Sequence, residues 1–91
     1  MKSVRLRITG RVQGVFYRGW TVDAANARGL NGWVRNRADG SVEALVSGED
    51  AEVDDLIAAC WNGPPAARVE GIEITPADRP DEKGFRQVAT R

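Results

Sequence analysis

A glycine-containing loop that ends in an arginine is the segment best suited to bind an anion. Residues Gly10 to Arg18 contain two glycines and lead into a predicted helix. Free backbone N–H groups and a partial charge of about +0.5 at the start of a helix favour a phosphate or carboxylate there. Arg18 lies in the first helical turn, where a cation opposes the dipole, so an anion held between its guanidinium and the amides would explain it. The alternative is an ordinary connecting loop followed by a solvated arginine.

Asn36 is the second residue whose type and position could do chemistry. It shares one face of a predicted strand with Val34, and we assign that face to the core. A side-chain amide at the end of a buried face must find hydrogen-bond partners. It could hold a water or a ligand beside the anion site, or it could cap the turn at Ala38–Gly40. The local sequence leaves both interpretations open.

The composition excludes several kinds of catalytic site. The chain has 91 residues, no histidine and one cysteine, Cys60. A Ser-His-Asp triad, a histidine-based zinc site and imidazole general-base chemistry are therefore impossible. An intramolecular disulfide is also impossible. No apolar run resembles a signal peptide or could span a bilayer, so we expect a reducing, cytoplasmic location and no membrane partner.

The charges cancel overall but are unevenly distributed. The chain has 13 basic and 13 acidic residues. Residues 1–37 contain eight basic residues and one acid, hence 8 − 1 = +7, which leaves −7 for the rest. The net charge of zero argues against a generally basic surface for nucleic acid. The positive excess in the N-terminal half favours an anionic ligand bound there.

Two segments have helical periodicity. Residues 17–28 form the first predicted helix, which Gly29 ends. The second helix ends before the Gly-Pro segment 62–65. It carries apolar residues at i, i+3, i+4, i+7 and i+8: Val53, Leu56, Ile57, Cys60 and Trp61. We therefore expect a buried, inert thiol at Cys60. For Trp61, and for Trp33 in the strand 31–37, we expect packing roles.

Five segments are predicted strands. They are residues 2–9, 31–37, 41–47, 67–75, with a bulge near Gly71, and 85–90. Ala38–Gly40 has the composition of a tight hairpin turn. The order of elements predicts a single domain over residues 1–91, of the α+β class. Its expected architecture is a ferredoxin-like βαββαβ sandwich, with an antiparallel sheet of about five strands and two helices on one face.

At the loop and at Asn36 the chain resembles the acylphosphatase family. Residues 10–18 are similar to its G-x-V-Q-G-V-x-F-R loop, with Tyr17 in place of the usual Phe. Residues 32–48 are similar to its second signature, G-[FYW]-V-[KR]-N-x3-G-x-V-x5-G, with every fixed spacing kept. The resemblance covers nearly the whole chain but fades after Gly71. In the last strand, Gln87 stands where the family usually has an aliphatic residue.

The resemblance implies a hydrolase that cleaves the carboxyl–phosphate bond of acyl phosphates to a carboxylate and inorganic phosphate. Arg18 would clamp the phosphoryl oxygens, and Asn36 would orient the water for in-line attack. Neither a metal nor a cofactor is implied. We expect a monomer whose partners are the acyl phosphate and inorganic phosphate, as product and inhibitor. The phosphoryl group would also be held by loop amides, those of Gln13, Gly14, Val15, Phe16, Tyr17 and Arg18.

The residues present suffice for this chemistry. An acyl phosphate releases a carboxylate with a pKa of only about 4, so the leaving group needs no general acid. A phosphate oxygen of the substrate can accept the proton of the attacking water. What remains is positioning and charge stabilisation, which amides, one arginine and one asparagine can supply.

Three other functions can be compared with the sequence. A nucleic-acid module of this fold class would carry the aromatic RNP1 pattern, which is missing here. A non-catalytic anion-binding module would have no need of both Arg18 and Asn36. A domain of a larger assembly that handles carbamoyl phosphate, as in hydrogenase-maturation factors, is the third. The length of 91 residues favours a free-standing enzyme.

Overall fold

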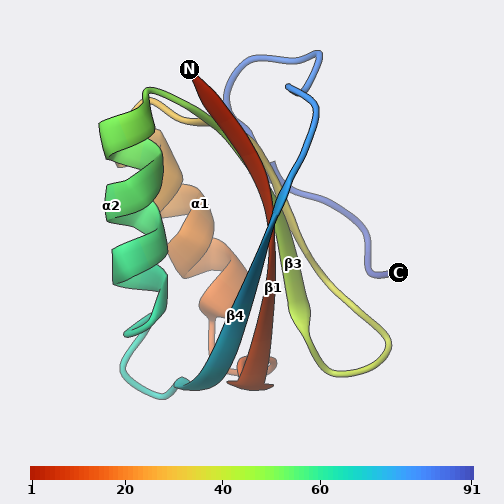
Figure 1. The fold of residues 1–91 in the computed structure, drawn as a ribbon. Helices are drawn as coiled ribbons and strands as arrows, with labels where there is room; N and C mark the ends of the chain where they lie inside the picture. Colours follow the sequence, from red (N-terminus) through yellow and green to blue (C-terminus); the bar gives the residue numbers. More distant parts are fainter.

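The alternating N-terminal segment forms a central strand of the sheet. In the computed structural model, which describes residues 1–91, β1 spans Lys2–Arg11. Figure 1 shows two helices, α1 and α2, packed side by side on one face of a twisted sheet. The strand order is β4-β1-β3-β2-β5. The other elements are α1 (Tyr17–Ala27), β2 (Asn31–Asn36), β3 (Val42–Gly48), α2 (Asp50–Cys60), β4 (Arg68–Pro76) and β5 (Phe85–Gln87).

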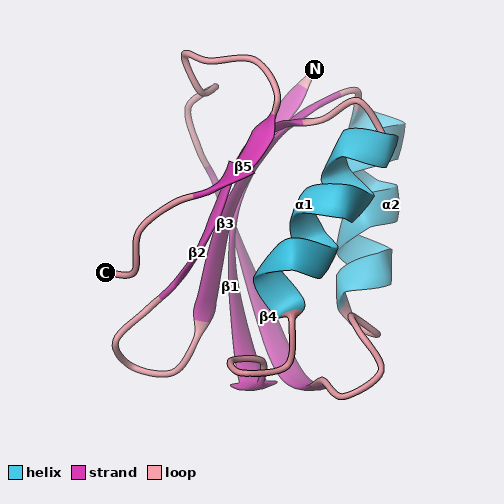
Figure 2. Ribbon diagram, turned by 180° about the vertical axis from the view of Figure 1, so that it is seen from behind, coloured by secondary structure: helices cyan, strands magenta, loops and turns pink.

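The sheet is mixed, so the prediction of an antiparallel sheet was wrong at one edge. Strand β5 pairs with β2 in parallel, with Val34 opposite Gln87, while the other pairs are antiparallel. After β4, the chain crosses the end of the sheet and returns along the far side of β2 (Figure 2). Residue alternation reports which face a side chain occupies but carries no information about strand direction.

The last strand is also shorter than predicted. It ends at Gln87, but the following segment stays beside β2 through backbone hydrogen bonds. The Val88 amide donates to Val34 O at 2.9 Å, and the Arg91 amide donates to Asn36 O at 3.1 Å. The C-terminal residues therefore run along β2 as far as Asn36.

The core lies between the sheet and the helices. Alternate residues of β1 and β3 and the stripe of α2 fill it, and nearly all are fully buried: Leu6, Ile8, Val42, Ala44, Val46, Val53, Leu56 and Cys60. Cys60 is fully buried, as predicted, and burial raises the pKa of its thiol to about 11. Trp61, at the end of α2, is 49% exposed and does not pack in the core as predicted. Neither helix is long and apolar enough to cross a membrane.

A β-bulge shapes the end of β1 from which the loop begins. The pairing of β1 with β4 shifts after Thr9 opposite Gly71, because Gly10 lies opposite Val69. The bulge therefore falls at Glu70, next to the predicted position. A Cβ on Gly10, whose φ is +115°, would lie 2.2 Å from Arg68 O, so only glycine fits there.

Candidate active site

The loop between β1 and α1 presents unbonded backbone N–H groups at the start of the helix. Val12 and Val15 are buried and anchor it. Gly14 and Phe16 have φ values of +73° and +68° and turn the chain into α1. None of the amides from residue 12 to residue 19 donates to a backbone acceptor, and no side chain caps the helix. These amides and the positive end of the helix dipole are free to bind an anion.

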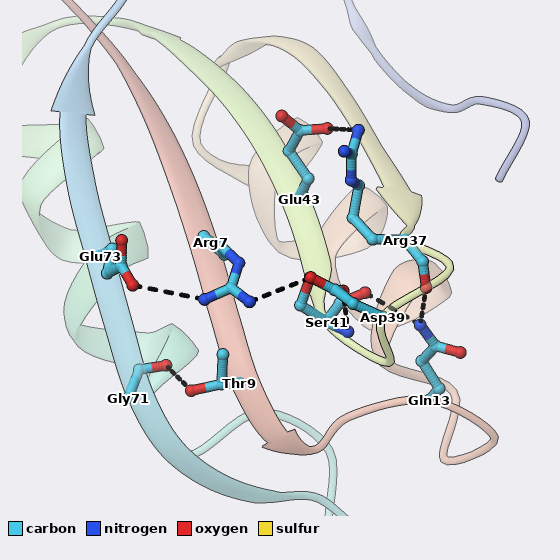
Figure 3. Close-up of polar contacts among 9 residues, drawn as sticks. All are labelled: Arg7, Thr9, Gln13, Arg37, Asp39, Ser41, Glu43, Gly71 and Glu73. Carbon is cyan, nitrogen blue, oxygen red and sulfur yellow. Dashed lines mark hydrogen bonds and ion pairs between the residues drawn. The ribbon is translucent and has the colours of Figure 1, made fainter. Parts of the chain in front are cut away.

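Gln13 fastens this loop to the turn between β2 and β3. Figure 3 shows its side chain directed at that turn. Its Nε2 donates to Arg37 O at 2.8 Å and to Ser41 O at 2.9 Å. The side chain therefore holds the loop next to the end of β2, and the backbone N–H is the only donor of Gln13 left for a ligand.

We expect Gln13→Ala to lower the free energy of unfolding by about 1–2 kcal/mol, because two partly buried hydrogen bonds are lost. Gln13→Glu should be more destabilising, since a carboxylate would face the two carbonyl oxygens. Thermal or urea unfolding of the wild type and both variants measures this. Equal stability of Gln13→Ala and the wild type would show that these two hydrogen bonds contribute nothing to the free energy of unfolding.

The β2–β3 turn has its own cap, which is Asp39. The Ser41 amide and hydroxyl donate to Asp39 Oδ1 at 2.9 and 2.6 Å, and Arg7 Nη2 donates to Oδ2 at 3.0 Å (Figure 3). The Ser41 hydrogen bonds, and then Arg7, hold the pKa of Asp39 well below its usual range. The hydrogen bonds that cap the turn thus come from Asp39 and Gln13, with none from the Asn36 side chain.

A pocket of about 130 Å³ brings the loop, α1 and the end of β2 together. Arg18 and Asn36, which are 18 positions apart in the chain, both line it. Gln13 and Val15 are also predicted site residues, but their side chains turn away from the pocket: that of Gln13 binds the turn and that of Val15 packs in the core. Their backbone amides stay unbonded in the loop. The complete lining is Val12, Gly14, Phe16, Tyr17, Arg18, Gly19, Asn36 and Gln87.

The two polar side chains predicted to do chemistry lack partners within the protein. Asn36 Oδ1 is buried and accepts no hydrogen bond. Arg18 is half-buried and takes part in none of the ion pairs. An unsatisfied buried polar atom costs about 1–3 kcal/mol, so this arrangement is unfavourable for folding alone. It suits a small ligand that accepts from Arg18 and donates to Asn36.

Phe16 and Tyr17 occupy opposite sides of the loop. Phe16 is 69% exposed at the rim, and its ring lies over Gly19, where a Cβ would approach Phe16 Cε1 to 2.4 Å. The Tyr17 ring is buried, and its hydroxyl donates to Cys60 O. Tyr17 therefore offers the pocket its backbone, while its side chain joins α1 to α2.

Sequence reasoning missed three residues of the lining: Val12, Gly19 and Gln87. Only Gln87 gave a signal, as a polar residue where an aliphatic one was expected. No group of three or more His, Cys, Asp or Glu side chains is placed to hold a metal ion.

Comparisons with known proteins point to one family. The family model Acylphosphatase matches residues 4–87. A protein named acylphosphatase from Rhodospirillum rubrum is 56% identical over 87 residues, which are 96% of each chain. The crystal structure of acylphosphatase from Bacillus subtilis has a TM-score of 0.91 and 36% identity, covering 97% of this chain and 99% of that one. An acylphosphatase structure from Coxiella burnetii has a TM-score of 0.91 and 32% identity, covering 96% and 92%.

Proposed function

This chain belongs to the acylphosphatase family and is a hydrolase acting on acyl phosphates, and we propose that the pocket between the loop and β2 is its catalytic centre. One observation carries the proposal. An arginine without an ion pair and a buried asparagine oxygen without a partner line one small cavity beside free helix-start amides. The proposed roles follow from what each group can donate or accept.

The phosphoryl group binds to the loop. The backbone amides from Gln13 to Arg18 donate to its oxygens, and the guanidinium of Arg18 binds two of them. Negative charge on these oxygens redistributes as the bond to the leaving group breaks. Donors already in place stabilise that charge without reorganisation, which is the main contribution a protein makes to phosphoryl transfer.

Asn36 orients the nucleophile. Its Oδ1 accepts a hydrogen bond from a water, whose lone pair then points at phosphorus in line with the leaving group. As the water oxygen bonds to phosphorus, the bond from phosphorus to the carboxyl oxygen breaks and releases a carboxylate. The other water proton passes to a phosphoryl oxygen, so the reaction needs no side-chain base and no general acid.

We further propose that the enzyme is a monomer that acts in the cytoplasm. The free, buried Cys60 fits a reducing cytoplasm. The pocket has room for a small acyl phosphate, with no need of a nucleic-acid partner, a metal or a cofactor. We assign the whole of residues 1–91 to one domain.

Purified protein is expected to hydrolyse acetyl phosphate in the presence of EDTA and to leave p-nitrophenyl phosphate, a phosphate monoester, almost intact. Inorganic phosphate should inhibit competitively, because it is the product and fits the same amides. Initial rates with each substrate in the presence of EDTA test the activity. Initial rates at several substrate and phosphate concentrations test the inhibition. Activity lost to EDTA and restored by a divalent ion would overturn the mechanism. Mixed or absent inhibition would place the site elsewhere.

A further inference from the structure

Gln87 is exposed at the edge of the sheet, and its side chain projects to the side on which the helices pack. It lies opposite Val34 in the parallel pairing of β5 with β2, and Val34 is fully buried under the helices. Two residues earlier, Phe85 is also buried. Because side chains alternate along a strand, Gln87 projects to the same side as Phe85, while Arg86 projects to the other and pairs with Glu82.

Gln87 and Asn36 are neighbours on adjacent strands. Asn36 follows Val34 by two positions, so both asparagine and glutamine lie on the helix side, next to Val34. The hydrogen bonds from Val88 to Val34 and from Arg91 to Asn36 hold the C-terminal segment against β2 at this level. Both residues line the same pocket of about 130 Å³, which holds only a few groups the size of a water.

We infer that Gln87 is a further catalytic residue, which holds the attacking water together with Asn36. The inference rests on the proposed function, because it concerns the same water. In the productive arrangement, the water donates one of its hydrogen atoms to Asn36 Oδ1 and the other to a phosphoryl oxygen of the substrate. One lone pair points at phosphorus, and Gln87 Nε2 donates to the remaining lone pair. These four contacts give the water a single orientation.

The residue type agrees with this role. A neutral amide can donate to the water without repelling the phosphoryl group, as a carboxylate would. The three contacts available without Gln87 leave one lone pair of the water unconstrained. Gln87 therefore adds one neutral hydrogen bond to the arrangement that reacts.

The test is Gln87→Met, which keeps the length of the side chain but removes the amide. We expect kcat to fall roughly 3- to 12-fold, as for one neutral hydrogen bond. KM and the inhibition constant of phosphate should stay within about twofold of the wild-type values. Gln87 binds the water, so it does not contribute to the affinity for substrate or for phosphate. Arg86→Met is the matched control on the opposite face of β5 and should retain wild-type kcat.

A second comparison identifies the shared water. In the Asn36→Ala background, Gln87→Met should cause little further loss, because the water is already unpositioned. Wild-type kcat in Gln87→Met, or losses that multiply in the double variant, would overturn the inference. Normal turnover of Asn36→Ala alone would instead overturn the proposed function.

A third variant covers the case in which Gln87→Met does not fold. Gln87→Glu keeps a polar side chain of the same shape but cannot donate when ionised. Its kcat relative to wild type should rise as the pH falls and the carboxyl group gains a proton. A ratio that does not change with pH would contradict a donor role for residue 87.

Discussion

Replacing Arg18 by alanine is expected to lower kcat/KM by about 10³-fold or more and to weaken inhibition by phosphate at the same time. A single preorganised donor is worth on the order of 10² to 10³ in rate, and a charged bidentate one is stronger. Arg18 is the only cationic side chain that lines the pocket. In the proposed mechanism Arg18 binds the same oxygens in substrate, transition state and product, so we expect both kcat/KM and phosphate affinity to fall. Initial rates and phosphate inhibition measure them.

Two further arginine variants sharpen this result. Arg18→Lys keeps the charge but loses the bidentate hydrogen bonding of the guanidinium, so its activity should lie between those of the wild type and Arg18→Ala. Arg11→Ala is the control, since Arg11 is exposed at the end of β1 and lies outside the pocket; it should keep wild-type turnover. Arg18→Ala should not lower stability, because the cation opposes the helix dipole. A folded Arg18→Ala enzyme with near-normal rate would refute the assignment.

Replacing Asn36 by alanine is expected to reduce kcat by about 10²-fold or more with little change in phosphate affinity. This pattern is characteristic of an interaction made chiefly in the transition state. In the proposed mechanism Asn36 positions the water, whereas the loop and Arg18 hold phosphate. The contrast between the two variants therefore separates the two roles. Steady-state kinetics and the inhibition constant of phosphate are the measurements.

Stability provides the control for Asn36. Since Asp39 caps the turn, Asp39→Ala should lower the melting temperature and leave the turnover of the folded protein unchanged. Asn36→Ala should show the reverse, a similar melting temperature with turnover lost. If Asn36→Ala instead lost stability and kept its rate, Asn36 would be a structural residue and the water would be positioned by other groups.

Local patterns were enough to identify most elements and two polar residues of the pocket, Arg18 and Asn36. Alternation along β2 placed Asn36 on the same face as buried Val34, and the structure has it there. The glycines and the helix start placed Arg18 at the positive end of α1, as observed. These features depend on residues a few positions apart, and such residues determine which side chains share a face or a helix turn.

The tertiary structure decided which distant segments meet. Strand β5 joins β2 in parallel because the chain crosses the end of the sheet after β4, and no local pattern encodes that path. Gln87 is therefore in the pocket. Other contacts between distant segments direct the Gln13 side chain to the β2–β3 turn and leave Trp61 outside the core. The sequence by itself determined the types of element and the chemistry available in the loop. Contacts between residues far apart in the chain were settled by packing, because they depend on how whole elements are placed.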